Sequence, residues 1–506
     1  MSRVFLTTTI PYVNAPPHLG FALEAVQADV LARHHRQRGD QVRLLTGTDD
    51  NSLKNVLAAE AAGVPVREWV DRHAEAIAAL RGPLALSYDD FIRTSSDPRH
   101  AAGVARLWRA CAAAGDFYRD TYEGLYCVGC ESYYTDADLV DGRCPEHGTE
   151  PQHLREENWF FRLSRYAAPL REAITSGALR IEPASRRNEV LALIDGGLRD
   201  FSVSRSRERA RGWGIAVPDD PDQVIYVWWD ALGNYVTSLD YGTDGEAYRR
   251  WWVGSDRRVH LLGKGVLRFH AIYWPAMLLS AGLPLPTDIL VHDYLTVDGR
   301  KISKSSGVNA DPVALADRYG TDALRWWLLR EVPRVGDVDF TPARLVERAD
   351  ADLAGGFGNL VNRVVTMVHR YREGAVPDVD EPPEAPELQR ACRDAPKLVA
   401  AALDDIDFRR ACAAVLGVVE QANRHIEQVR PWELARAERG GDATAGRRLD
   451  AALSALISVC RALGPLLAPL LPHAAAAITR QCAEVGGRLP EARPLFTRLG
   501  GDRPAA

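Results

Sequence analysis

The first part of the chain alternates between apolar runs and one amphipathic stretch. Residues 4–8 and 42–45 are short runs of apolar and β-branched side chains, and each predicts a buried strand. Between them, helical spacing begins near His18 and ends at Gly39. The apolar face of this helix consists of Leu19, Leu23, Val26 and Val30. A strand, a helix and a strand in succession predict a βαβ unit, and hence a parallel sheet with a right-handed crossover.

The alternation breaks between residues 115 and 225. This stretch holds short aromatic runs, many arginines and a cysteine cluster, and we interpret it as an insertion. Strands predicted over residues 224–227, 259–262 and 289–291 resume the sheet. From about residue 345 onward, apolar residues recur at three- and four-residue spacing, which predicts a helical bundle.

Composition adds the class of protein. The chain has 506 residues, which predicts several domains, and it is 46% hydrophobic and 26% charged with a net charge of −6. A local basic face can still bind a large RNA at this net charge. The N-terminus carries no signal segment, and no apolar run reaches the roughly eighteen residues of a membrane span. We therefore expect a cytoplasmic protein without a membrane partner, in which the eight cysteines are metal ligands or buried thiols.

Three of these cysteines form the motif with the most specific spacing. Cys127-Val-Gly-Cys130 is followed by Cys144-Pro-Glu-His147. Two ligand pairs of this spacing close a tetrahedron around one Zn²⁺ ion and leave no position for water, so the site is predicted to be structural. The alternative is an accidental cluster in which His147 is an ordinary surface residue.

Two further motifs suit a nucleotide. His18-Leu-Gly20-Phe21 stands where a loop enters the first helix, and the N–H groups at a helix start suit phosphate. Lys301-Ile-Ser-Lys304-Ser305 is a lysine pair in a loop rich in serine and glycine, which suits closure on a polyphosphate. Each motif alone is weak, because a histidine before a helix is more often a cap or a surface residue, and the lysine pair could equally be a solvated turn.

Together, the three motifs and their order resemble the class I aminoacyl-tRNA synthetases. The signatures of that class are a H-x-G-H tetrapeptide and a K-M-S-K-S loop, and within it the chain is most similar to the methionyl family. The matching stretches are Pro11-Tyr-Val-Asn14, His18-Leu-Gly20, Leu45-Thr-Gly-Thr-Asp49, Trp228-Trp-Asp-Ala231, Asn234-Tyr235, Gly263-Lys264, Arg268-Phe-His-Ala-Ile-Tyr-Trp-Pro-Ala276 and Val291-His292 to Ser305. The resemblance covers nearly the whole chain, and the cysteine motif matches the single-zinc form of the family.

The resemblance implies a role for individual residues. Asp49 would hold the ammonium group of methionine, and the family's methionine pocket would be lined by Ile10, Tyr12, Trp228, Ala231, Leu232, Tyr235, Val266 and His270. ATP, with Mg²⁺, would be met by His18, Gly20 and Phe21, while Lys301 and Lys304 close on its phosphates; His18 and the two lysines would be catalytic. Without the match, core packing would be the favoured interpretation of Trp228 and Tyr235. In the helical bundle, Asn359, Arg363 and Trp432 fall where the family contacts the CAU anticodon.

The fold implied is a doubly wound α/β, Rossmann-like catalytic domain with a zinc-bearing insertion and a C-terminal all-α bundle. The predicted boundaries are 1–114 and 226–290 for the two halves of the catalytic domain, 115–225 for the connective insertion, 291–345 for a stem segment with the lysine loop, 346–490 for the anticodon-binding bundle, and 491–506 for a tail. Because the chain stops just after the bundle, a monomer is expected.

Three departures from the family pattern stand around the predicted cleft. Phe21 replaces the fourth signature histidine, Asp50-Asn51-Ser52 replaces the usual bacterial Glu-His-Gly, and Gly265 replaces an aspartate. Phenylalanine cannot donate a hydrogen bond to phosphate, and a lost transition-state donor costs roughly 10²–10³ in rate. The main hypothesis is activation of methionine and its transfer to tRNA(Met). The alternatives are a paralogue that uses the adenylate or a charged tRNA to form amides in specialised metabolism, and a non-catalytic tRNA-binding protein.

Overall fold

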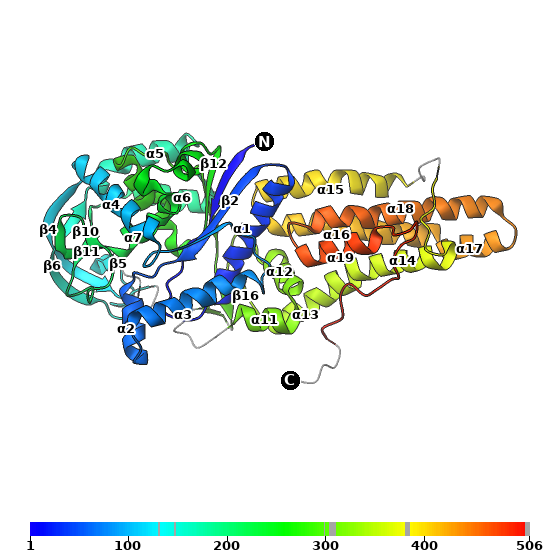
Figure 1. The fold of residues 1–506 in the computed structure, drawn as a ribbon, viewed down its shortest axis with the longest axis horizontal. Coiled ribbons are helices and arrows are strands. Elements are labelled where there is room, and N and C mark those ends of the chain that lie inside the picture. The colour runs from blue at the N-terminus through cyan, green and yellow to red at the C-terminus, as the bar shows by residue number, and fades with distance from the viewer. Residues whose placement is uncertain (130–131, 146–147, 298, 303–309, 380–384, 501–506) are drawn as a thin grey trace. The chain divides into compact units, whose positions relative to one another are not determined.

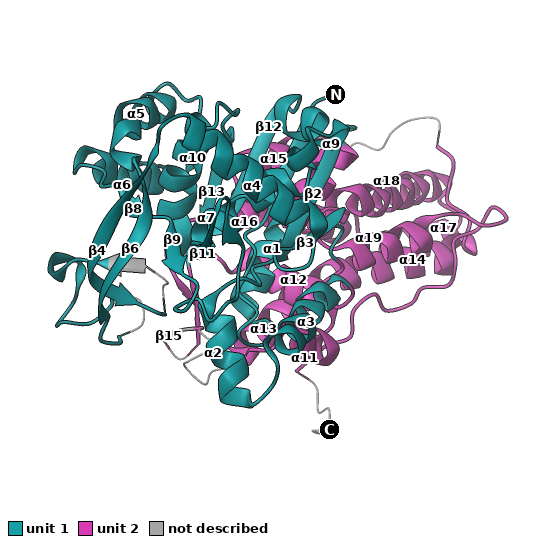
Figure 2. Cartoon of the chain, turned by 60° about the vertical axis from the view of Figure 1, so that its left-hand side comes forward, with its two compact units in different colours: residues 1–28, 38–81, 86–293 teal, residues 29–37, 82–85, 294–506 magenta. Residues whose placement is uncertain are grey.

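The computed structural model describes residues 1–129, 132–145, 148–297, 299–302, 310–379 and 385–500, and it divides into two compact units (Figures 1 and 2). The N-terminal unit comprises residues 1–28, 38–81 and 86–293, and the C-terminal unit comprises residues 29–37, 82–85 and 294–506. Helix α1 (Leu19–Gln37) contributes its first half to one unit and its second half to the other. Each unit has its own buried core, so each is described by itself.

A six-stranded parallel sheet forms the centre of the N-terminal unit. Its strand order is β3-β2-β1-β12-β13-β7, and every neighbouring pair runs parallel. The strands are β1 (Arg3–Thr7), β2 (Gln41–Thr48), β3 (Asp90–Arg93), β7 (Arg180–Glu182), β12 (Arg257–Gly263) and β13 (Asp288–His292). The α/β class with a parallel sheet, predicted from the sequence, is confirmed.

The central strand is apolar on both faces because helices cover both faces of a parallel sheet. In β1, the side chains from Val4 to Thr7 are all buried. Two helices of this unit begin at a side-chain cap: Ser52 and Asp97 accept hydrogen bonds from the first-turn N–H groups of α2 and α4. Besides α1, the helices are α2 (Leu53–Ala62), α3 (Val66–Ala78), α4 (Pro98–Ala113), α5 (Ala167–Thr175), α6 (Ala184–Asp195), α7 (Val227–Leu232), α8 (Asn234–Thr237), α9 (Glu246–Tyr248) and α10 (Trp274–Ser280).

Between α4 and α7, strand β7 joins the main sheet and the remaining strands form two small antiparallel sheets. One has the order β5-β4-β6-β8 and the other β10-β11-β9. Their strands are β4 (Phe117–Cys127), β5 (Ser132–Tyr134), β6 (Gln152–Phe161), β8 (Phe201–Ser202), β9 (Ser204–Ser206), β10 (Ala216–Val217) and β11 (Asp220–Ile225). The strand predicted over residues 224–227 therefore does not resume the main sheet: residues 224 and 225 end β11, and α7 begins at Val227.

The C-terminal unit is mostly helical. Its small sheet has the order β15-β14-β16, with β14 (Leu295–Val297), β15 (Arg300–Lys301) and β16 (Val338–Asp339). The helices are α11 (Pro312–Tyr319), α12 (Thr321–Arg330), α13 (Pro342–Arg348), α14 (Asn359–Arg372), α15 (Pro386–Asp404), α16 (Phe408–Val429), α17 (Pro431–Arg439), α18 (Ala443–Leu467) and α19 (Pro472–Cys482). In Figure 1, α14, α16, α18 and α19 run alongside one another, which confirms the predicted helical C-terminal region.

Helix α18 is the centre of this bundle. Among the described residues it is the one helix long and apolar enough, by length and composition, to cross a membrane. Thirteen of its residues are buried against neighbouring helices, from Ala445 to Leu467. Burial of this kind identifies α18 as the core helix of a bundle. The charged residue Arg461 also lies within this apolar helix.

Candidate active site

The predicted substrate residues follow the carboxyl ends of the strands in the main sheet. The strand order reverses between β1 and β12, because the chain adds β2 on one side of β1 and later adds β12 on the other. Open α/β sheets bind ligands in the crevice outside the carboxyl ends at such a switch point. Residues 8–18 follow β1, residues 49–52 follow β2, and residues 264–270 follow β12. Three motifs that are distant in sequence thus meet at one edge of the sheet.

His18 stands directly before α1, with its ring folded over the first turn. Its Nδ1 accepts a hydrogen bond from the Gly20 N–H at 3.1 Å. A Cβ atom at position 20 would lie 3.0 Å from the His18 ring, so a larger residue there would press on the ring, and glycine leaves it this position. Because Nδ1 accepts, the neutral ring carries its proton on Nε2, a tautomer suited to donation to a phosphate oxygen.

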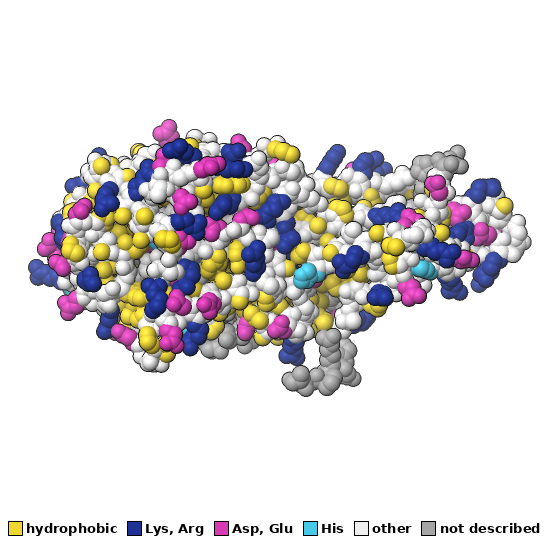
Figure 3. Space-filling model, in the orientation of Figure 1, with side chains coloured by type: hydrophobic (Ala, Val, Ile, Leu, Met, Phe, Trp, Pro, Cys, Tyr) yellow, Lys and Arg dark blue, Asp and Glu magenta, His cyan; other side chains and the backbone are white. Residues whose placement is uncertain are grey.

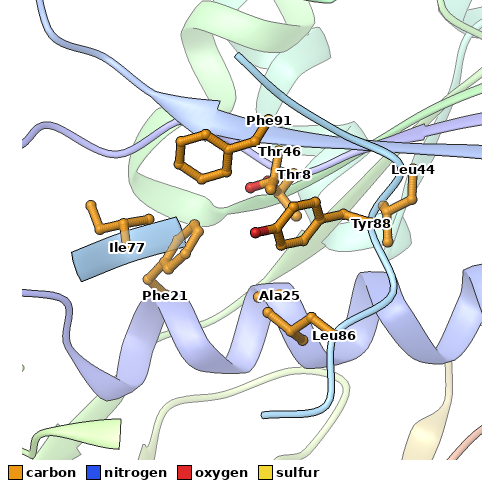
Figure 4. Close-up of a pocket in the computed structure, with 9 residues that line it drawn as sticks. All are labelled: Thr8, Phe21, Ala25, Leu44, Thr46, Ile77, Leu86, Tyr88 and Phe91. Carbon is orange, nitrogen blue, oxygen red and sulfur yellow. The ribbon is translucent and has the colours of Figure 1, made fainter. Parts of the chain in front are cut away.

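Phe21 packs into the protein rather than lying open at the helix start. Its side chain is 8% exposed and faces a small apolar cavity of about 10 Å³, opposite Ile77, Tyr88 and Phe91 (Figure 4). The cavity is lined by Thr8, Phe21, Ala25, Leu44, Thr46, Ile77, Leu86, Tyr88 and Phe91. The aromatic ring at this departure from the family pattern is therefore accommodated by an apolar environment.

Asp49 is held in the turn that follows β2. Its side chain is 2% exposed, and its backbone N–H donates to the Pro11 carbonyl at 3.0 Å. One carboxylate oxygen accepts the Asn51 N–H at 3.3 Å, and Asp49 pairs as an isolated bridge with Tyr12. These contacts fix the carboxylate beside the β1 loop, where a positively charged group can pair with it.

The predicted methionine-binding residues lie close to one another on this side of the unit. Tyr12 and Trp228 meet edge to face with ring centroids 6.3 Å apart, and Trp228 and His270 meet at 6.4 Å. The Trp228 indole also stacks on Phe269 at 3.8 Å. Ile10, Tyr12, Trp228 and Val266 are partly buried against the core that includes Leu232 and Tyr235, and Ala231 is buried. The result is an aromatic wall of the kind that suits a polarizable thioether.

Two buried histidines behind this wall are held neutral. His270 Nδ1 lies 2.8 Å from the Val266 carbonyl and must donate to it, so Nε2 accepts from the Tyr235 hydroxyl at 2.7 Å. His260 Nε2 accepts from the Trp274 indole N–H at 3.1 Å, which leaves its Nδ1 to donate to Thr7 Oγ1 at 2.7 Å. Burial lowers the pKa of His270 to about 4 and the pKa of His260 well below its usual range.

These histidines predict a loss of stability in mild acid. The pKa of His270 is about 4 in the folded protein and near 6.5 in the unfolded chain, so below pH 6.5 the unfolded chain binds a proton that the folded protein does not. We expect the free energy of unfolding to fall by about 2–3 kcal/mol between pH 6.5 and pH 4 because of His270 alone. Urea unfolding of wild type and His270→Gln across this range measures the effect. The difference between the two proteins should shrink by that amount, and parallel stability curves would contradict the prediction.

A second polar cluster at the switch point was not singled out in the sequence. Glu24, on the first half of α1, accepts hydrogen bonds from the Thr9 N–H and hydroxyl at 2.6 Å each, and from His292 Nε2 at 3.1 Å. The Glu24 side chain is 4% exposed. It therefore joins the end of β1, helix α1 and the end of β13. The sequence did not single out Glu24, because an acidic residue beside the apolar face of a helix is normally expected to be exposed to solvent.

The lysine loop belongs to the C-terminal unit. The backbone of Lys301 pairs with Thr296 of β14, at the end of β15. Its side chain and all of residues 303–309, including Lys304, lie outside what the structure describes. The phosphate-binding role of this loop stays a prediction.

The predicted zinc ligands are partly covered. Cys127 ends β4, and the side chains of Cys127 and Cys144 are 2% and 1% exposed. The Gly148 N–H donates to the Cys144 carbonyl, and the Cys144 N–H donates to the Thr149 carbonyl. Cys130 and His147 lie outside the described residues. Cys127 and Cys144 are two of the four donors that a closed Zn²⁺ site needs, and the described residues hold no group of three or more potential metal ligands.

The predicted anticodon residues share one face of the C-terminal bundle. Asn359 and Arg363 are one turn apart on α14, and the Arg363 guanidinium lies 5.6 Å from the centre of the Trp432 ring on α17. Asn359 is exposed, Arg363 and Trp432 are half-buried, and Arg363 also pairs with Glu427 at 2.8 Å. Over the face drawn in Figure 3, basic and acidic side chains are interspersed.

Comparison with known proteins decides the family. The profile of the family described as "tRNA synthetases class I (M)" matches residues 4–153 and 137–365, which cover both halves of the main sheet. The chain belongs to this family of class I tRNA synthetases. Membership accounts for the order of motifs around the switch point of the sheet.

Several methionine--tRNA ligases match this synthetase over almost all of its length. That of Caldanaerobacter subterraneus subsp. tengcongensis is 40% identical over 471 residues, which are 93% of this chain and 72% of the relative. The ligase of Mycobacterium bovis is 38% identical over 504 residues, covering 97% of this chain and 95% of the relative.

Solved structures of the family agree with the synthetase in fold as well. The Mycobacterium tuberculosis methionyl-tRNA synthetase in complex with methionyl-adenylate is 37% identical, with a TM-score of 0.91 over 99% of this chain and 100% of that chain. The free-state structure of the same synthetase gives a TM-score of 0.86 at 34% identity, over 100% of this chain and 99% of that chain.

Proposed function

We propose that this chain activates methionine with ATP and transfers the methionyl group to tRNA(Met). The observation that carries the proposal is the placement of Asp49 near an aromatic wall at the switch point of the sheet, in a fold similar to one solved with methionyl-adenylate. Asp49 pairs with the ammonium group, and the wall receives the thioether. The neutral His270 keeps a charge out of this apolar region.

The reaction proceeds in two displacement steps. A carboxylate oxygen of methionine attacks the α-phosphorus of ATP in line, forming the acyl–phosphate bond while pyrophosphate leaves with its electron pair. A terminal ribose hydroxyl of tRNA then attacks the acyl carbon, gives up its proton, and releases AMP. Neither step forms a covalent bond to the protein, so positioning and charge stabilisation are what the chain must supply.

Phosphate contacts are assigned to the start of α1 and to the lysine loop. His18, Gly20 and the backbone of Phe21 border the ATP site, while the Phe21 ring is buried, and His18 Nε2 donates to a phosphate oxygen. The sequence has only five lysines among 62 basic residues, at positions 54, 264, 301, 304 and 397. Two of the five lysines lie close together in the sequence, at Lys301 and Lys304. This supports a specific role for their ammonium groups, which are compact point charges that close on the phosphates of Mg²⁺-bound ATP.

The domain boundaries follow from these assignments. Residues 1–114 and 226–290 form the catalytic domain, residues 115–225 the connective insertion, which also supplies strand β7 to the main sheet, and residues 291–345 the stem segment. Residues 346–490 form the anticodon-binding bundle and residues 491–506 the tail. The proposed place of action is the cytoplasm.

The insertion holds one structural Zn²⁺ ion through Cys127, Cys130, Cys144 and His147. Closed tetrahedral coordination stabilises the insertion because binding energy is gained only in the folded state. Elemental analysis of protein purified without chelators should find about one zinc per chain. The double variant Cys127→Ser, Cys130→Ser should lose the metal, while Cys111→Ser, which removes a buried core thiol, should keep it. Equal zinc contents in the two variants would contradict the assignment.

Anticodon recognition is assigned to Asn359, Arg363 and Trp432. An unpaired base stacks on the Trp432 ring, and the two polar side chains hydrogen-bond base edges. Trp432→Ala should weaken tRNA binding by about 1–3 kcal/mol. Tyr371→Ala is the matched control, because Tyr371 is a half-buried ring on α14 with the Arg370 guanidinium 5.8 Å from its centre. Equal affinities of the two variants, measured by filter binding at fixed salt, would exclude stacking on Trp432.

Pyrophosphate exchange tests the proposed function. We expect ATP–pyrophosphate exchange that depends on methionine and that is at least 100-fold weaker with leucine, isoleucine or valine. The reason is that each group of the wrong amino acid that does not fit the pocket costs roughly 1–3 kcal/mol. Exchange with another amino acid, or none with methionine, would contradict the proposal. Methionine-dependent exchange without charging of tRNA would instead point to another acceptor for the adenylate.

A further inference from the structure

A buried carboxylate, Asp230, stands between the two parts of the proposed methionine site. We infer that Asn51 and His100 are positioning residues for methionine, which act by holding Asp230 in place. The inference rests on the proposed function and deepens it, because Asn51 is one of the departures from the family pattern. Neither residue is assigned to touch the substrate.

Both oxygens of Asp230 are satisfied by side chains from distant parts of the unit. Asp230, on α7, is fully buried. His100 Nε2, at the start of α4, lies 2.5 Å from Oδ1, and Asn51 Nδ2 donates to Oδ2 at 2.7 Å. A carboxylate only accepts hydrogen bonds, so His100 Nε2 carries a proton. Loss of either donor would leave a buried carboxylate oxygen unpaired, which is costly.

The two donors are themselves held in place. His100 Nδ1 lies 2.8 Å from Thr237 Oγ1, and the His100 ring is fully buried. Gly103 lets α4 approach that threonine, because a Cβ atom at position 103 would lie 2.5 Å from Thr237 Cγ2. The Asn51 amide also donates to the Thr94 carbonyl at 3.3 Å. The hydrogen bonds therefore form one network rather than a pair of isolated contacts.

Asn51 joins the two parts of the methionine site through this network. Its backbone N–H donates to the Asp49 carboxylate, which is assigned to the ammonium group. Its side chain holds Asp230, in the same two turns of α7 as Trp228, Ala231 and Leu232, which are assigned to the thioether pocket. The distance between the ammonium site and the pocket thus depends on the Asn51–Asp230 hydrogen bond. A change in that distance weakens methionine binding without touching ATP.

Kinetics of three Asn51 variants test the inference. Asn51→Ala removes the donor and should raise the KM for methionine about tenfold, as expected for one hydrogen bond to a charged group. Asn51→Asp places a second carboxylate against Asp230 and should raise it about 100-fold, since two close carboxylates repel. The KM for ATP should stay within about twofold in both. The double variant Asn51→Asp, Asp230→Asn restores a donor and an acceptor, and its KM for methionine should fall below that of Asn51→Asp.

Asn158→Asp is the matched control for folding effects. Asn158 is fully buried in the same unit, and its Nδ2 donates to Glu156 Oε2 at 3.3 Å, so this substitution also sets two carboxylates together. Its KM for methionine should equal that of wild type. Equal KM for methionine in wild type and Asn51→Ala, or equal rises for methionine and ATP, would overturn the inference. A wild type without methionine-dependent exchange would instead contradict the proposed function. If Asn51→Asp does not fold, Asn51→Ala decides.

Discussion

Replacing Lys304 by alanine should lower the rate of methionine activation by about 10²–10³-fold while the affinity for methionine stays within about twofold, because a removed transition-state donor costs that much. Charge on the departing pyrophosphate increases only as the bond to the α-phosphorus breaks. A lysine that meets this charge stabilises the transition state more than the bound substrates. The rate from single-turnover adenylate formation and the affinity from isothermal titration separate the two effects.

Lys397→Ala serves as the control for this variant. Lys397 is exposed on α15, so its removal should change neither quantity. A Lys304→Ala variant that activates methionine as fast as Lys397→Ala would show that the loop is a solvated turn. Equal losses of rate and affinity would mean that Lys304 binds the ground state and the transition state alike.

Replacing Asp29 by asparagine should lower the free energy of unfolding by about 3–5 kcal/mol, the cost of leaving a buried charge without its partner. The Arg325 guanidinium lies 2.9 Å from Asp29, and both side chains are completely buried in the C-terminal unit. Arg325 also donates to the carbonyls of Leu84, Pro469 and Leu470. Burial lowers the pKa of Arg325, and Asp29 is the main group that opposes this shift.

Asp405→Asn provides the comparison for Asp29→Asn. Asp405 pairs with Arg410 at 2.6 Å in the same unit, but both side chains are about half exposed. An exposed pair contributes less than about 1 kcal/mol, so this variant should unfold close to wild type. Urea unfolding followed by far-ultraviolet circular dichroism measures both variants. Similar midpoints for the two would show that Asp29 and Arg325 do not depend on each other.

The fold class could be predicted from the sequence because its signals are local. The run from residue 4 to residue 45 carries its own strand and helix spacing, and the main sheet forms there as predicted. The two outer strands of that sheet, β3 and β7, were missed because four and three residues give no period to detect. The prediction that residues 224–227 resume the main sheet was wrong for a related reason. An apolar run indicates a buried strand but does not indicate the sheet to which that strand belongs.

The candidate site was predictable as a set of motifs but not as a set of contacts. From the sequence, Phe21 is interpreted as a lost phosphate donor, whereas in the structure its buried side chain lines a small cavity together with Ile77 and Tyr88. Asn51 reads as a second loss, yet its amide holds Asp230, which lies 179 positions away. Hydrogen bonds between such distant residues have no signature in local spacing. The sequence therefore predicts which motifs form the site, but not the hydrogen bonds that position its residues.

Charging of tRNA with radiolabelled methionine tests the central claim most directly. The full chain is mixed with ATP, Mg²⁺, methionine and tRNA transcripts that carry either a CAU anticodon or a substituted one. The account predicts ester-linked methionine on the CAU transcript and at least tenfold less on the substituted transcript, the loss expected for a change of about 1.4 kcal/mol. Pyrophosphate exchange without any labelled tRNA, or equal labelling of both transcripts, would contradict it.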